Sequence, residues 1–271
     1  MLNPQAGEVL CFDKPYALTS FRVVSRVRGI LNHRLGLSPK AAVKVGHAGT
    51  LDPLATGVLI VCTGKATRLI DQLQAGTKEY IATLRLGATT PSLDMETAED
   101  AHFPTGHITR ELVTQVLSRF VGRIEQVPPA FSAVRVDGKR AFKLARKGKE
   151  PELRPKTLVI DEIECLDFQP LPSTGMPTTV KIKEAKDLTN AAAVGIRNAA
   201  LTPSLTIRVV CSKGTYIRAL ARDIGQALGS GAYLQALRRT RVGAYGIDQC
   251  LRIEDFEQWV NEQEIETTPI Q

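Results

Sequence analysis

The sequence predicts an α+β fold with a largely antiparallel mixed sheet flanked by helices. Apolar or alternating segments of strand length are mixed with amphipathic helical segments, and no regular strand-helix-strand rhythm connects them. The chain has 271 residues, of which 43% are hydrophobic and 23% are charged. This composition is ordinary for a folded globular protein and excludes a chain that is disordered throughout.

The first third of the chain predicts strands and helices in turn. Residues 8–13 are expected to form a strand, and Ser20 is expected to cap a helix. The apolar positions of that helix recur every three or four residues: Phe21, Val24, Val27, Ile30 and Leu31. A buried strand at 58–63, a helix at 67–73 and a half-buried strand at 79–86 follow.

The remainder of the chain continues this mixture. We expect a helix around 112–120, strands at 130–136 and 158–168, and a strongly basic segment at 139–149. A strand at 205–211, a helix at 215–228, a strand at 232–242 and a closing helix at 253–259 complete the pattern. In the helix at 215–228, Arg218 and Arg222 lie off the apolar stripe.

One catalytic domain over residues 1–250 is predicted, with a short C-terminal helix and tail at 251–271. Residues 169–203 change in character, because prolines flank an Ala-rich stretch, and this region is expected to be a surface insertion without chemistry.

Several functional classes are excluded or disfavoured by composition. No apolar stretch approaches the roughly 20 residues that span a bilayer, and no signal peptide is evident, so we expect a cytoplasmic protein that does not enter membranes. The five cysteines are odd in number and lie mostly in apolar runs, so we expect them to be buried and reduced. Neither cysteines nor histidines have zinc-site spacing, and no metal is expected. Lys and Arg exceed Asp and Glu by 35 to 28, which favours a polyanionic partner.

Familiar nucleotide and hydrolase motifs are not matched. Residues 57–65 superficially resemble a phosphate-binding loop, but six residues separate the two glycines and Ala66 replaces the required Ser or Thr. No dinucleotide-binding fingerprint follows a strand, and no nucleophile elbow is present. Because these motifs are not matched, the sequence does not support nucleotide-driven transfer or serine hydrolysis.

The segment GHAGTLDPLATG (residues 46–57, the Gly-rich loop) leads into the buried strand at 58. Such a loop on a rigid strand can hold a carboxylate where a ligand approaches the backbone. From the residues alone, Asp52 is either such a carboxylate or a turn residue before Pro53.

The Gly-rich loop resembles the signature of the TruB family of transfer-RNA pseudouridine synthases. Four further segments resemble family motifs in the family's order: Lys14-Pro15 with Thr19-Ser20, Lys78-Glu79-Tyr80, Gly214 to Arg218, and Leu237 to Thr240. The resemblance covers about residues 8–243. It implies the pseudouridine-synthase fold and the isomerisation of uridine 55 in the T stem-loop of transfer RNA, with no cofactor, no protein partner and a monomeric enzyme.

The resemblance also implies roles for six residues. Asp52 is the nucleophile, Arg218 pairs with it, and Tyr80 stacks on the target base, which must be flipped out of the RNA. The other three contribute to substrate binding: His47 enters the RNA loop, Lys14 braces the Gly-rich loop, and Leu237 lines the pocket. The basic segments at 22–28, 139–149 and 238–241 are then expected to contact the RNA backbone.

Two other functions fit the sequence less closely. An RNA-binding or RNA-chaperone module would bind the same arm without changing it, and a nucleoside-level enzyme would act on free uridine or its monophosphate. Many family members end in an RNA-binding PUA domain. The 28 or so residues after Gly243 are too few for one, so we expect this domain to be absent.

Overall fold

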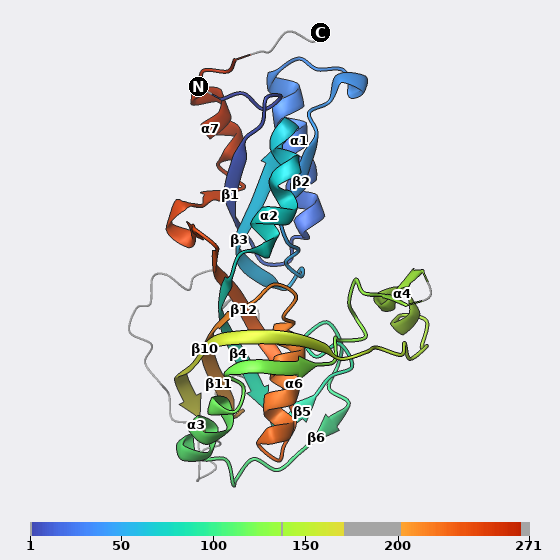
Figure 1. Cartoon of the computed structure of the whole chain (residues 1–271), viewed down its shortest axis with the longest axis vertical. Coiled ribbons are helices and arrows are strands. Elements are labelled where there is room, and N and C mark those ends of the chain that lie inside the picture. Colours follow the sequence, from blue (N-terminus) through green and yellow to red (C-terminus); the bar gives the residue numbers. More distant parts are fainter. Residues whose placement is uncertain (1, 137, 171–201, 267–271) are drawn as a thin grey trace. The chain divides into compact units, whose positions relative to one another are not determined.

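The computed structural model describes residues 2–136, 138–170 and 202–266, which form the predicted α+β fold with a largely antiparallel sheet (Figure 1). The chain divides into two compact units, Met1–Glu79 with Arg238–Gln271 and Tyr80–Leu237. The boundary falls inside two strands, β4 (Lys78–Leu86) and β12 (Ala232–Val242), both of which the sequence predicted. The predicted catalytic domain at 1–250 and tail at 251–271 stay predictions.

The first unit is built on strands in the order β14-β1-β3-β12. β1 pairs antiparallel with β3 and parallel with β14, while β2 pairs with β3 and β13 pairs with β12. Its other elements are β1 (Val9–Lys14), α1 (Ser20–Arg34), η1 (Pro39–Ala41), β2 (Val45–His47), β3 (Ala55–Thr63), η2 (Gly64–Leu69), α2 (Ile70–Ala75), β13 (Tyr245–Gly246), η4 (Ile247–Gln249), β14 (Leu251–Arg252) and α7 (Phe256–Glu262).

Strand β3 is buried along its whole length because both faces of the sheet are covered. Leu59 and Val61 belong to a hydrophobic cluster with residues of α1 and α7, including Phe256, whose ring meets that of Phe12 edge to face. Ile60 belongs to a second cluster that α2 residues cover on the opposite face. Burial on both faces explains why the sequence shows a continuous apolar run here rather than alternation.

Helix α1 forms where the sequence predicted it, but two details of the prediction are wrong. Thr19, not Ser20, caps the helix: its Oγ1 accepts a hydrogen bond from the Arg22 amide at 3.1 Å. Phe21 was expected in the core and is 68% exposed, because Val23 takes the buried position in its place. The rest of the buried stripe lies where it was predicted, at Val24, Val27 and Leu31.

The second unit has strands in the order β12-β4-β11-β10-β7. β10 pairs antiparallel with both β11 and β7, and α3 contacts β10 and α6. Its elements besides β4 and β12 are β5 (Ala88–Thr89), β6 (Ala101–His102), α3 (Arg110–Ser118), β7 (Gly122–Gln126), β8 (Arg135–Val136), β9 (Lys139–Arg140), α4 (Ala141–Ala145), β10 (Lys156–Gln169), β11 (Ser204–Cys211) and α6 (Ile217–Ala227).

The sequence prediction fails around residues 122–136 of this unit. Only β8 (Arg135–Val136) is a strand within the predicted 130–136, and the carbonyls of Phe131 and Ser132 accept hydrogen bonds from Arg218 Nη2 and the Phe142 amide instead of joining a ladder. Strand β7 (Gly122–Gln126) was missed, because it starts with glycine and contains only one apolar residue, Ile124. Of the predicted insertion at 169–203, residues 171–201 lie outside the described residues.

The cysteines depart from the expectation that all are reduced. Cys11 of β1 and Cys250 form a disulfide, with their Cα atoms 4.7 Å apart. The other three remain thiols: Cys62 and Cys211 are buried and Cys165 is half-buried. Burial raises the pKa of the Cys62 thiol to about 11, so this thiol stays protonated near neutral pH. None of the described helices is both long and apolar enough to cross a membrane.

Candidate active site

The Gly-rich loop connects two paired strands of the first unit. β2 pairs antiparallel with β3, with His47 opposite Val61, so the loop leaves one strand and returns on its neighbour. Asp52 is half-buried near the tip, between buried Leu51 and exposed Pro53. The loop thus presents one carboxylate from a support that is fixed at both ends.

Ser20 fixes the residue before Asp52. Its Oγ accepts a hydrogen bond from the Leu51 amide and donates one to the Leu51 carbonyl, both at 2.9 Å. Ser20 is buried, so water does not compete for either bond. Because Thr19 caps the helix, the Ser20 hydroxyl is available to connect α1 to the Gly-rich loop.

Lys14 fixes the residue after Asp52. Its Nζ lies inside the protein and donates to three carbonyl oxygens, those of Pro15 at 2.9 Å, Leu18 at 2.7 Å and Pro53 at 3.3 Å. Burial lowers the pKa of Lys14 from 10.5 to about 8, and the Asp52 carboxylate acts in the opposite direction by attracting the ammonium charge. The structure therefore brings Lys14 and Asp52 within electrostatic reach of each other.

Arg239 is a third buried group at this loop, which the sequence did not single out. Its Nε donates to the Val58 carbonyl at 2.8 Å and its Nη2 donates to the Gly49 carbonyl at 3.2 Å. The residue is only 2% exposed, so its expected contact with the RNA backbone is wrong. The sequence offered no local signal for this burial, because Arg239 stands among Arg238, Thr240 and Arg241 in a polar stretch of β12.

His47 lies at the end of β2 and is half-buried. Burial lowers its pKa, and the nearby Arg239 guanidinium lowers it further, so the ring is neutral at neutral pH. Its Nδ1 is buried and has no hydrogen-bond partner among the described residues.

The other three predicted residues, Tyr80, Arg218 and Leu237, belong to the second unit. Tyr80 is buried in β4 and Leu237 is half-buried in β12, and they are the first and last residues of this unit. Arg218 was expected off the apolar stripe of its helix. The stripe itself is confirmed, but Arg218 is buried as well, in the first turn of α6.

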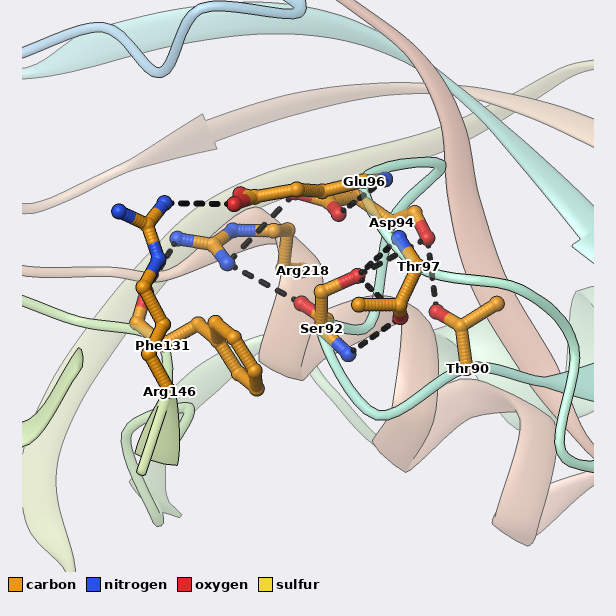
Figure 2. A network of polar contacts seen from close by, with 8 residues as sticks. All are labelled: Thr90, Ser92, Asp94, Glu96, Thr97, Phe131, Arg146 and Arg218. Atoms are coloured by element: carbon orange, nitrogen blue, oxygen red, sulfur yellow. Dashed lines mark hydrogen bonds and ion pairs between the residues drawn. The ribbon is translucent and has the colours of Figure 1, made fainter. Parts of the chain in front are cut away.

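Figure 2 shows how Arg218 is held. Its Nη1 donates to the Ser92 carbonyl and its Nη2 to the Phe131 carbonyl, both at 3.0 Å, and its Nη1 lies 3.6 Å from Asp94 Oδ2. Asp94 Oδ1 in turn accepts a hydrogen bond from the Glu96 amide at 2.9 Å. The buried carboxylate of Asp94 was missed in the sequence, where the surrounding Thr, Pro and Ser suggest only a turn.

The arrangement suits chemistry by a carboxylate. The first unit offers Asp52 on a loop whose neighbouring carbonyls are held by buried side chains, with the ammonium of Lys14 nearby. Within the described part of the chain, no group of three His, Cys, Asp or Glu side chains is placed to hold a metal ion.

Two family models match the chain. The one described as TruB family pseudouridylate synthase (N terminal domain) matches residues 36–188, and the one described as tRNA pseudouridylate synthase B C-terminal domain matches residues 218–270. Together they include the predicted site residues at positions 47, 52, 80, 218 and 237. Lys14 lies before the first match.

Curated relatives named tRNA pseudouridine synthase B match nearly the full chain. The protein of Phocaeicola vulgatus is 55% identical and that of Bacteroides thetaiotaomicron 56% identical, each over 265 residues that cover 98% of this chain and 98% of the relative. The protein of Mycobacterium leprae is 40% identical over 92% of this chain and 68% of its own length.

Two solved structures have a similar fold. A chain in the crystal structure of a Cbf5-Nop10-Gar1 complex is 30% identical with a TM-score of 0.62, and the match covers 94% of this chain and 55% of that chain. A chain in the structure of an H/ACA RNP bound to a substrate RNA containing 2'-deoxyuridine is 28% identical with a TM-score of 0.59, over 95% of this chain and 54% of that chain. This chain thus spans about half the length of both.

Proposed function

The chain belongs to the TruB family and is a transfer-RNA pseudouridine synthase, and we propose that it converts uridine 55 of the T stem-loop to pseudouridine with Asp52 as the nucleophile. The observation that carries the proposal is the support of the Gly-rich loop. Buried Ser20 and Lys14 hold the carbonyls on either side of Asp52, which is the support a nucleophile needs to be presented in one geometry.

The reaction is an isomerisation, so its atoms balance within the substrate. The bond between N1 and C1′ of the nucleotide breaks, the base rotates, and C5 bonds to C1′. The proton on C5 is lost to a base and N1 gains a proton from water. Asp52 attacks either C1′ of the ribose or C6 of the base, and both routes use the same ionised carboxylate.

The other predicted residues complete the proposal. Arg218 supplies a planar guanidinium for the nucleophilic carboxylate, Tyr80 stacks on the flipped base, and Leu237 lines the pocket beneath it. His47, which is neutral near pH 7, enters the RNA loop and occupies the place that the base leaves. The enzyme acts as a monomer in the cytoplasm, without a cofactor.

Tritium release tests the proposal directly. A T stem-loop carrying [5-³H]uridine only at position 55 releases tritium to water when C5 loses its proton. We expect release with the wild-type protein and none with Asp52→Asn, while both bind the stem-loop with affinities within about threefold, since a neutral isostere leaves the loop's backbone contacts intact.

Three outcomes would contradict the proposal. Tritium release by Asp52→Asn would remove Asp52 as nucleophile. Binding without release by the wild-type protein would favour an RNA-binding or RNA-chaperone module. Equal turnover of free uridine or its monophosphate would favour a nucleoside-level enzyme.

A further inference from the structure

We propose that Arg239 is a positioning residue for the reaction, which holds together the two ends of the Gly-rich loop and thereby fixes the place of Asp52. The inference rests on the proposed role of Asp52 as nucleophile. Arg239 itself is buried and donates to main-chain carbonyls of the loop and of β3.

The two carbonyls that Arg239 binds lie on opposite sides of Asp52 in the chain. The Gly49 carbonyl precedes Asp52, and the Val58 carbonyl follows it on β3. One planar guanidinium presents its Nε–H and Nη2–H groups in fixed directions, so it sets the distance between the two ends. An ammonium is a point donor on a flexible stem and cannot fix both directions at once.

Gly57 makes the close approach to Arg239 at this loop, and Gly49 is in ordinary contact with it. Gly57 has φ +103°, and a Cβ built there would lie 2.1 Å from the Arg239 carbonyl oxygen. Gly49 has φ +100°, and its Cβ would lie 3.7 Å from Arg239 Nη1. The backbone of β12 at residue 239 therefore approaches one end of the loop while the side chain reaches the other.

A purely stabilising role does not require an arginine at this position. Burying a cation costs free energy, and replacing a buried charged group by an apolar one of similar volume is often neutral or stabilising. Arg239 also disfavours the charged forms of two groups near the loop, since it lowers the pKa of both Lys14 and His47. Only a guanidinium supplies the directional hydrogen bonds that hold the loop.

The test compares Arg239→Lys and Arg239→Met with Leu31→Ala. Leu31 is fully buried in the core of the same unit, on α1, and its truncation destabilises the fold without removing a hydrogen bond of the loop. For each folded variant we would measure the single-turnover rate of tritium release from the labelled stem-loop, the dissociation constant of the RNA, and amide hydrogen exchange at residues 48–56.

Both Arg239 variants are expected to lose about 100-fold in rate, the cost of misplacing a reacting group by about 1 Å, with the dissociation constant within about twofold of wild type. Their loop amides should exchange faster. Leu31→Ala should lower the denaturation midpoint but keep the wild-type rate and loop protection.

A wild-type rate for Arg239→Lys would overturn the inference, because positive charge alone would then suffice. A rate loss by Leu31→Ala as large as that of the Arg239 variants would overturn it too, since it would trace the loss to stability. If Arg239→Met does not fold, Arg239→Lys decides. Asp52→Asn in the same assay separates the two proposals, because its activity bears on the nucleophile whatever Arg239 does.

Discussion

The pH dependence of the reaction should report the protonation of Lys14. Burial lowers the pKa of this side chain to about 8, so its ammonium loses a proton just above neutral pH. The neutral amine has two N–H groups for the three carbonyls that Nζ now binds, and it no longer attracts the Asp52 carboxylate. The Pro53 carbonyl, at 3.3 Å, has the longest of the three bonds and should be the first to be released.

The size of the effect follows from the pKa. With a pKa of about 8, the protonated fraction is about 90% at pH 7 and about 10% at pH 9. If only the protonated form holds the loop, kcat/KM should fall about tenfold over this range, because kcat/KM reports groups of the free enzyme. The measurement is tritium release at low stem-loop concentration in buffers from pH 6.5 to about 9.5.

Two controls separate this effect from unfolding and from the substrate. Because the folded pKa lies below the unfolded value of 10.5, the unfolded chain binds more protons between about pH 8 and 10.5, so this group makes the folded state more stable as pH rises through that window. Loss of rate would therefore occur without loss of fold. Lys14→Met should be slow at every pH and lack the fall near pH 8, while any fall caused by ionisation of the uracil ring should persist. A wild-type profile that is flat through pH 8, or the same fall in Lys14→Met, would refute the reasoning.

Three further predictions concern stability and RNA binding. Asp94→Asn should lower the free energy of unfolding by about 2 kcal/mol in urea denaturation, because it removes the negative charge from a buried ion pair with Arg218, whereas Glu96→Gln removes an exposed ion pair and should cost under about 1 kcal/mol. Gly57→Ala should cost about 2–4 kcal/mol in the same assay, because its Cβ meets the β12 backbone at 2.1 Å. Replacing exposed Arg22 and Arg26 together by Gln should weaken stem-loop binding and lower the slope of log Kd against log salt concentration by about 1–2, as measured by fluorescence anisotropy.

Much of the fold could be predicted because local pattern and tertiary burial agree. β4 alternates buried and half-buried residues along its length, and α6 buries the apolar stripe that its spacing indicates. The failures occur where a tertiary contact overrides the local pattern. Ser20 has good capping chemistry, yet a neighbouring threonine takes the cap and the Ser20 hydroxyl binds the Leu51 backbone instead. Strand β7 pairs with β10 despite a polar sequence, and such pairing has no local signal.

The sequence motifs of the candidate site could be predicted, but the burial and pairing of the residues around them could not. Gly49 and Gly57 stand out in the sequence because positive φ angles restrict residue type, whereas Asp52 was singled out by the resemblance of the loop to a family motif. Asp94 does not stand out, because a carboxylate in a turn segment is ordinary until its pairing with a buried guanidinium is seen. Arg239 was grouped with its basic neighbours, of which Arg238 pairs at the half-exposed surface with Asp13, 2.9 Å away. Charge identifies these arginines as a group, whereas only the register of β12 separates the buried one from the others.

Side chains from outside the Gly-rich loop hold it through its main-chain carbonyls. Ser20, Lys14 and Arg239 come from α1, β1 and β12, and each binds backbone carbonyls of the loop or of the strand that follows it. Hydrogen bonds to these carbonyls place no demand on which side chains the loop carries at those positions. The information that fixes the loop lies instead in polar residues at buried positions of distant strands and helices. A buried cation is costly unless its donors are satisfied, and Lys14 and Arg239 satisfy theirs with backbone carbonyls of the loop and its flanking segments.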